Sequence, residues 1–110
     1  MHLYPADGAA SRVGKEHTAF SYREAGWVQV IVGVDPDPQN VEPAKQWARD
    51  YWEALHPSSL GGGYVNMLMS DEGDDRVRST YRENYDRLAD VKRTYDPDNL
   101  FRVNWNIAPA

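Results

Sequence analysis

Residues 95–101 read Tyr-Asp-Pro-Asp-Asn-Leu-Phe, and residues 104–107 read Asn-Trp-Asn-Ile. Asp96 to Asn99 predict a tight turn, because proline stands at the second position. The preceding residues predict an amphipathic helix from about 74 to 94, with acidic residues in its first turn and Lys92 and Arg93 in its last. The apolar stripe of this helix comprises Val77, Tyr81, Tyr85 (or Asn84), Leu88, Val91 and Tyr95.

N-terminal to this helix, the clearest strand signal is found in residues 27–34, in which four valines at alternate positions line one face. Both faces are mostly apolar, so we expect a central strand. Residues 17–22 and 64–69 read as further extended segments, and residues 40–55 as an amphipathic helix capped by Asn40. We therefore expect residues 1–110 to form one α+β domain, a small antiparallel sheet covered by two amphipathic helices.

Composition narrows the classes of function. Seventeen acidic and twelve basic residues give a net charge of −5, which disfavours nucleic acid as a partner. There is no cysteine, so disulfides and thiol chemistry are excluded. No apolar run approaches the roughly 20 residues of a membrane span, and the N-terminus lacks an export signal, which predicts a cytoplasmic protein.

Gly61-Gly62-Gly63-Tyr64-Val65-Asn66 is the most site-like segment. Three glycines allow a flat ligand to approach the backbone closely. In an extended segment Tyr64 and Asn66 share one face, so the phenol and the amide point to the same place. The alternative is a flexible loop followed by a half-buried strand. No metal site is expected, because the three histidines lack ligand spacing and the acidic residues 71–75 lack the alternation of a calcium loop.

The C-terminal motifs resemble the berberine-bridge-enzyme-like FAD-linked oxidases, in their C-terminal domain only. The resemblance covers about residues 2–107 and is most specific in the second half. It implies that Tyr64 is the base that deprotonates a substrate hydroxyl, and that Asn66 neighbours it at the flavin edge. It implies that Asn104 and Asn106 help to seat the tail against the flavin domain; alternatively, they are polar anchors. Trp105 stands where the family commonly has Gln.

The family's flavin-binding domain is not found in this sequence, and Gly61 to Gly63 do not form a phosphate loop because they precede a strand. We therefore expect the substrate-side domain of an FAD-dependent oxidoreductase acting on a hydroxyl-bearing sugar or natural product. It would need a flavin domain in trans and would hold FAD only weakly alone. The alternatives are a non-catalytic homodimeric binding module and a cofactor-free enzyme of secondary metabolism that uses Tyr64.

Overall fold

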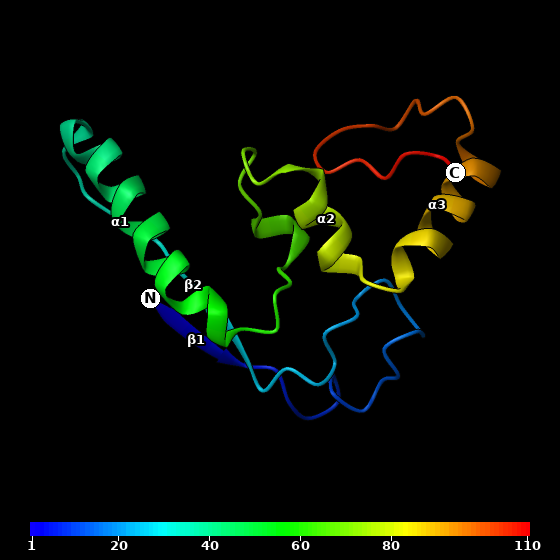
Figure 1. The fold of residues 1–110 in the computed structure, drawn as a ribbon, viewed down its shortest axis with the longest axis horizontal. Helices are drawn as coiled ribbons and strands as arrows, with labels where there is room; N and C mark the ends of the chain where they lie inside the picture. The colour runs from blue at the N-terminus through cyan, green and yellow to red at the C-terminus, as the bar shows by residue number, and fades with distance from the viewer.

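A two-stranded sheet and three α-helices make up the computed structural model, which describes residues 1–110 (Figure 1). The predicted α+β class with a small antiparallel sheet is confirmed. In chain order the elements are β1 (His2–Pro5), β2 (Trp27–Val30), α1 (Val41–Leu55), α2 (Gly73–Tyr81) and α3 (Asn84–Tyr95), with short 3-10 turns at Pro38–Asn40, His56–Ser58 and Val65–Met67.

The sheet is a hairpin in which β1 pairs antiparallel with β2, with His2 opposite Val30 and Pro5 opposite Trp27. The prediction of a long central strand over residues 27–34 is wrong, because β2 ends at Val30 and all four residues of β1 are exposed. Residues 31–34 have no partner strand within this chain. Residues 17–22, also predicted to be a strand, form none, because Ser21 and Tyr22 are buried against α2 instead.

Helix α1 matches its predicted range closely. The side chain of Asp37 caps the preceding 3-10 turn by accepting the backbone N–H of Gln39 at 2.9 Å. Asn40 occupies the N-cap position of α1 but makes no side-chain cap bond. Gly33 lies so close to α1 that a β-carbon there would stand 2.7 Å from the carbonyl oxygen of Ala44. The segment after β2 is therefore held against the start of α1.

The helix predicted over residues 74–94 is in fact two helices, broken at Arg82. Arg82 has φ 48° and ψ −129°, and this backbone conformation ends α2. A positive φ is costly for any residue that carries a side chain. Its guanidinium group makes three contacts. It pairs with Glu24 at 2.5 Å, donates to the carbonyl of Leu60, and lies 3.6 Å from the centre of the Tyr22 ring. Tertiary contacts therefore override the helical periodicity at this point.

The buried interior is small and largely polar. Seven of 110 residues are buried: Ser21, Tyr22, Val77, Thr80, Asn84, Ala89 and Asp96. The predicted apolar stripe is wrong at its C-terminal end, since Val91 is 48% and Tyr95 83% exposed, whereas Val77 and Asn84, the alternative to Tyr85, are buried as predicted. The polar side chain of Asn84 can be buried because its amide donates to the hydroxyl of Ser21 at 2.7 Å and to the carbonyl of Lys15 at 2.8 Å.

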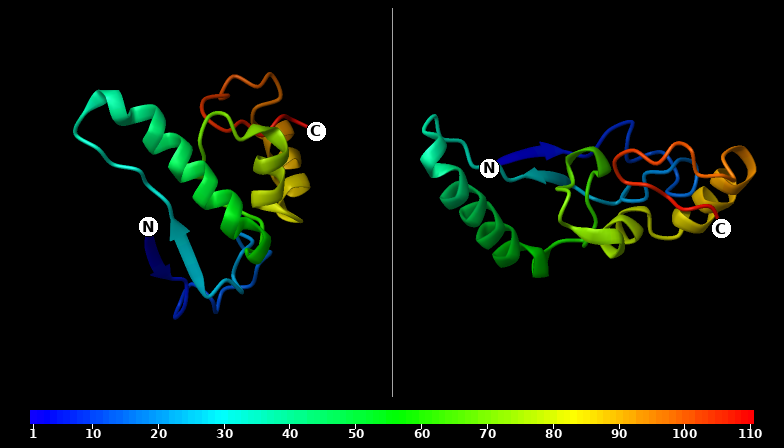
Figure 2. Two further views of the ribbon diagram at one scale, coloured as in Figure 1. Left: turned by 60° about the vertical axis from the view of Figure 1, so that its left-hand side comes forward. Right: turned by 90° about the horizontal axis from the view of Figure 1, so that it is seen from above.

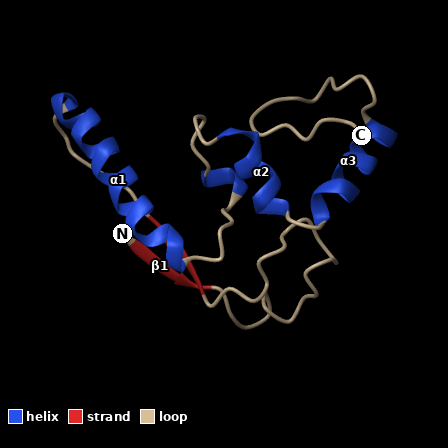
Figure 3. Cartoon of the chain, viewed as in Figure 1, coloured by secondary structure: helices blue, strands red, loops and turns tan.

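The chain is open in shape. Its radius of gyration is 16.1 Å, against about 13 Å for a compact domain of roughly 100 residues. Helix α1 and the hairpin form one arm, while α2, α3 and the C-terminal tail form another (Figures 1 and 2). The second predicted helix therefore does not cover the sheet: α2 and α3 lie away from it (Figure 3). None of the helices is both long and apolar enough to cross a bilayer.

Candidate functional site

Tyr64 and Asn66 form a hydrogen-bonded pair at the surface. The amide nitrogen of Asn66 donates to the phenol oxygen of Tyr64 at 2.8 Å, and the Tyr64 side chain is 47% exposed. The predicted extended backbone is wrong here, because Val65–Met67 form a 3-10 turn in which the backbone N–H of Met67 donates to the carbonyl of Tyr64 at 2.8 Å. The turn, rather than strand alternation, brings the two side chains together.

Each of the three glycines before Tyr64 is favoured at its position for a different structural reason. Gly61 has φ +90°, which side chains rarely adopt. A β-carbon on Gly62 would overlap the ring of Tyr22, and one on Gly63 would stand 2.7 Å from a methyl carbon of Leu68. The flat group that approaches the glycine loop is thus Tyr22 of the same chain, whereas the sequence had suggested an external ligand.

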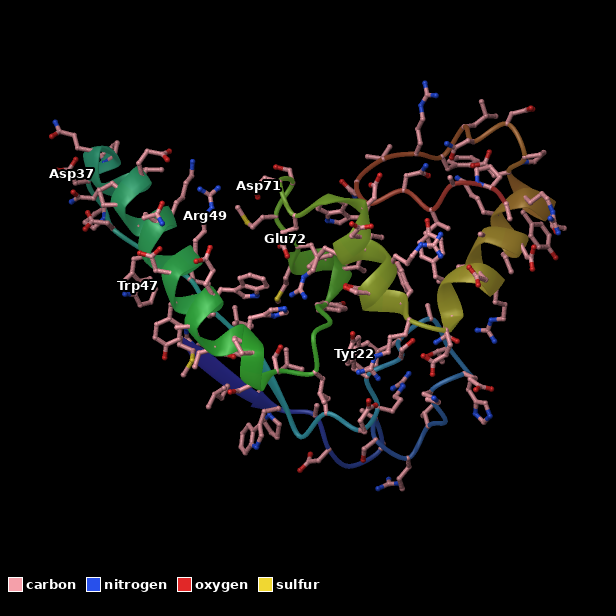
Figure 4. The ribbon with its side chains drawn as sticks, viewed as in Figure 1. Tyr22, Asp37, Trp47, Arg49, Asp71 and Glu72 are labelled. Carbon is pink, nitrogen blue, oxygen red and sulfur yellow. The ribbon has the colours of Figure 1, made fainter.

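Arginine side chains tie this loop to the helices. Arg76 of α2 donates to the carbonyl of Gly61, pairs with Glu72 at 3.0 Å, and lies 5.3 Å from the ring centre of Trp52 in α1. Arg49 of α1 reaches Asp71 at 2.5 Å across the gap between the two arms (Figure 4). Two of the four acidic residues at 71–75 are therefore paired with arginines, and no cluster of three or more metal-ligating side chains is found.

The C-terminal tail folds back from α3 and passes above α2 (Figure 1). The indole nitrogen of Trp105 donates to the carbonyl of Leu68 at 3.5 Å, which joins the tail to the segment that carries Tyr64 and Asn66. Asn104 is exposed with φ 61°. Asn106 is half-buried, and its amide oxygen is buried without a hydrogen-bond partner. Neither asparagine is hydrogen-bonded to Tyr64 or Asn66.

Asp96 fixes the start of the tail. Its carboxylate accepts the backbone N–H groups of Leu100 at 2.7 Å and Phe101 at 3.0 Å, and it pairs with Lys92. The hydrogen bond from Lys92 holds the pKa of Asp96 below its ordinary value, and the two backbone donors act in the same direction. The predicted turn is confirmed, since the N–H of Asn99 donates to the carbonyl of Asp96 at 3.0 Å.

An open, mostly apolar cavity of about 330 Å³ lies between α3 and the tail. Its walls include Leu88 and Val91 of α3, Trp105 of the tail, and Asn106 with its unpartnered oxygen. Phe101, which also lines the cavity, is 79% exposed. The tail is therefore anchored at Asp96 and Trp105 while much of its apolar surface stays uncovered.

Residues 63–108 match the family model described as berberine and berberine like. This region belongs to the berberine and berberine-like family. The berberine-like region includes all four side chains proposed from the sequence, namely Tyr64, Asn66, Asn104 and Asn106. The hairpin and α1 lie outside it.

Similar proteins extend the likeness to nearly the whole chain. The FAD-linked oxidoreductase YgaK of Bacillus subtilis is 36% identical over 93% of this chain and 22% of its own length. The FAD-linked oxidoreductase fogF of Aspergillus ruber is 36% identical over 91% of this chain and 20% of its own. The (R)-6-hydroxynicotine oxidase of Paenarthrobacter nicotinovorans is 32% identical over 96% of this chain and 25% of its own. The chain spans about a fifth to a quarter of these relatives, and it is homologous to the C-terminal part of FAD-linked oxidoreductases.

Proposed function

We propose that residues 1–110 supply the substrate-facing side of an FAD-linked oxidoreductase that oxidises a hydroxyl-bearing small molecule, a sugar or a natural product. Tyr64 is the base that takes the proton from the substrate hydroxyl. FAD, held by polypeptide other than residues 1–110, supplies the acceptor for the hydride. The likeness to FAD-linked oxidoreductases supports this reading.

The observation that carries the proposal is the exposed hydrogen bond from Asn66 to Tyr64 within the berberine-like region. Hydrogen bonds to a charged acceptor are stronger than those to a neutral one, so the amide stabilises negative charge on the phenol oxygen. The Tyr64 hydroxyl donates to no protein acceptor. A substrate hydroxyl can therefore approach the phenol oxygen while Asn66 fixes the ring orientation.

The residues fit one part of the cofactor and not another. The exposed phenol of Tyr64 and amide of Asn66, which follow the glycine loop, suit contact with the edge of a flat ring. Nothing in the loop suits a pyrophosphate, because Gly61–Gly63 lead into a three-residue 3-10 turn rather than the N-terminus of a long helix. The net charge of −5 also opposes a phosphate group. We therefore expect the isolated chain to hold FAD weakly.

The uncovered apolar surface supports a polypeptide partner. Eighteen large hydrophobic side chains are exposed, on both arms of the molecule. Exposed apolar surface of this extent usually marks an interaction site. A flavin-binding domain, in the same or another polypeptide, is the partner that the family likeness favours.

A chimera tests the proposed function. Residues 1–110 would replace the aligned segment of B. subtilis YgaK, and the purified product would be assayed for bound FAD and for bleaching of the flavin by a panel of sugars and natural-product alcohols. We expect retained FAD and anaerobic bleaching by at least one compound. A chimera that holds FAD but is bleached by no compound of the panel, although some of these compounds bleach intact YgaK, would contradict the proposal.

The same exposed surface favours a second candidate, a non-catalytic module that forms a homodimer through its apolar faces. Sedimentation of the isolated chain separates the two. A stable dimer that does not respond to FAD, combined with an inactive chimera, would support the binding module. A monomer that gains activity in the chimera would support the oxidoreductase.

A further inference from the structure

Tyr22 is the largest side chain in the buried interior, although it comes from a segment without regular structure. It is 7% exposed. Its hydroxyl donates to the carbonyl of Ser79 in α2 at 2.7 Å, and the guanidinium carbon of Arg82 lies 3.6 Å from its ring centre. Figure 4 shows Tyr22 beneath the end of α2. The ring is thus held by groups from α2 and from the break that follows it.

The ring also touches the glycine loop. The backbone of Gly62 lies so close that a β-carbon would overlap the ring, so only glycine fits while Tyr22 stays in place. The neighbouring loop carbonyls are held by arginines: that of Leu60 accepts from Arg82 at 3.4 Å, and that of Gly61 accepts from Arg76. Tyr22 therefore fills the space between the loop and α2.

We propose that Tyr22 is a positioning residue for the Tyr64–Asn66 pair, acting through its ring against Gly62. Only Gly63 separates Gly62 from Tyr64, so a shift of the loop moves the phenol directly. The catalytic meaning of this role rests on the proposed function, but the positioning itself is a property of the chain.

The physical reason is the freedom of the glycine backbone. Three glycines in succession lose more conformational entropy on ordering than any other residues would, so the loop needs an external support to adopt one position. A rigid ring supplies that support with only two side-chain torsions to fix. An error of about 1 Å in the position of a reacting group costs on the order of 100-fold in rate.

Nuclear magnetic resonance on the complete chain tests the inference. In the wild type we expect nuclear Overhauser contacts between the Tyr22 ring protons and the α-protons of Gly62, with the latter shifted upfield by the ring current. The reporter for positioning is the side-chain amide of Asn66, whose resonances depend on its bond to Tyr64. Absence of the ring–glycine contacts in the wild type would overturn the inference, whatever the variants do.

Two pairs of variants make the test specific. Tyr22→Phe keeps the ring and should leave the Asn66 amide at its wild-type position, whereas Tyr22→Leu removes the ring and should shift it. Gly62→Ala should displace the ring and shift the Asn66 amide as well. Gly26→Ala is the matched control, because a β-carbon there meets no atom within 4 Å and Gly26 has an ordinary φ. An unshifted Asn66 amide in folded Tyr22→Leu or Gly62→Ala would refute the role.

The YgaK chimera gives the functional readout. We expect Tyr22→Leu to slow flavin bleaching by about 100-fold without loss of FAD, and Tyr22→Phe to restore the rate. An inactive chimera in which the Asn66 amide still responds to Tyr22→Leu would refute the proposed function but not the positioning. An active chimera indifferent to Tyr22→Leu would refute the catalytic meaning of the positioning and leave the proposed function standing.

Discussion

The carboxylate of Asp96 accepts the backbone N–H of Leu100 at 2.7 Å, and so turns the chain back at the end of α3. The same carboxylate binds the N–H of Phe101 and the ammonium group of Lys92. The Lys92 ammonium also donates to the Phe101 carbonyl at 2.5 Å. One acidic side chain thus sets the direction of the tail that reaches Leu68 through Trp105.

This arrangement predicts a dependence on pH. The Lys92 hydrogen bond lowers the pKa of Asp96 in the folded chain from its ordinary value of 3.8. A carboxyl group whose pKa is lowered by folding stabilises the fold at pH values above its ordinary pKa. That stabilisation is lost as the pH falls through the lowered pKa of the folded chain. We expect the amide protons of Leu100 and Phe101 to keep constant chemical shifts from neutral pH to near 4 and to move together below it.

Substitution of Asp96 gives the matching control. Asp96→Asn should shift both amides at neutral pH and remove their common acid transition. Asp98→Asn should not, because Asp98 is exposed and bonds to neither amide. An acid transition that survives in Asp96→Asn would assign the effect to another group.

The helix break at Arg82 predicts an unusual order of stabilities. Arg82→Ala and Arg82→Gly both lose the ion pair with Glu24 and the contact with Tyr22, but only glycine relieves the positive φ. We expect the glycine variant to have a free energy of unfolding about 1 kcal/mol larger than the alanine variant. Urea unfolding measures the difference. An alanine variant that equals or exceeds the glycine variant would show that the break carries no strain.

The buried amide of Asn84 predicts a strong contrast between two asparagines. Asn84→Ala removes the bonds to Ser21 and Lys15 inside the chain, and we expect a loss of about 1–3 kcal/mol in the free energy of unfolding. Asn40→Ala should cost much less, because the Asn40 side chain makes no cap bond. Thermal and urea unfolding of the two variants test this, and equal losses would contradict the account.

Local chemistry made helix α1 and the Asp96–Asn99 turn predictable, whereas the break between α2 and α3 was missed. The amphipathic pattern located α1, and the Asp96–Asn99 turn followed from proline at its second position. The motif from Tyr95 to Phe101 indicates the family from sequence alone, and residues 63–108 match its model. These features depend on residues close together in the chain.

Contacts between residues far apart in the chain could not be predicted from local sequence patterns. Nothing near Arg82 predicts a positive φ, because the groups that hold it, Glu24 and Tyr22, lie about 60 residues away in the chain. The glycine triplet did signal a close approach, but only the fold reveals that the approaching ring is Tyr22. The length of β2 depends on a pairing partner, and β1 offers only four residues.

The proposed function depends most on the role of Tyr64, and rapid-mixing reduction of the YgaK chimera tests that role most directly. The chimera and its Tyr64→Phe variant would be mixed anaerobically with the alcohol that bleaches the flavin fastest, and the rate of bleaching followed. Loss of a general base typically lowers the rate by about 100- to 10,000-fold. We predict a fall of this size in Tyr64→Phe with FAD content unchanged, and an equal rate in the two proteins would contradict the central claim.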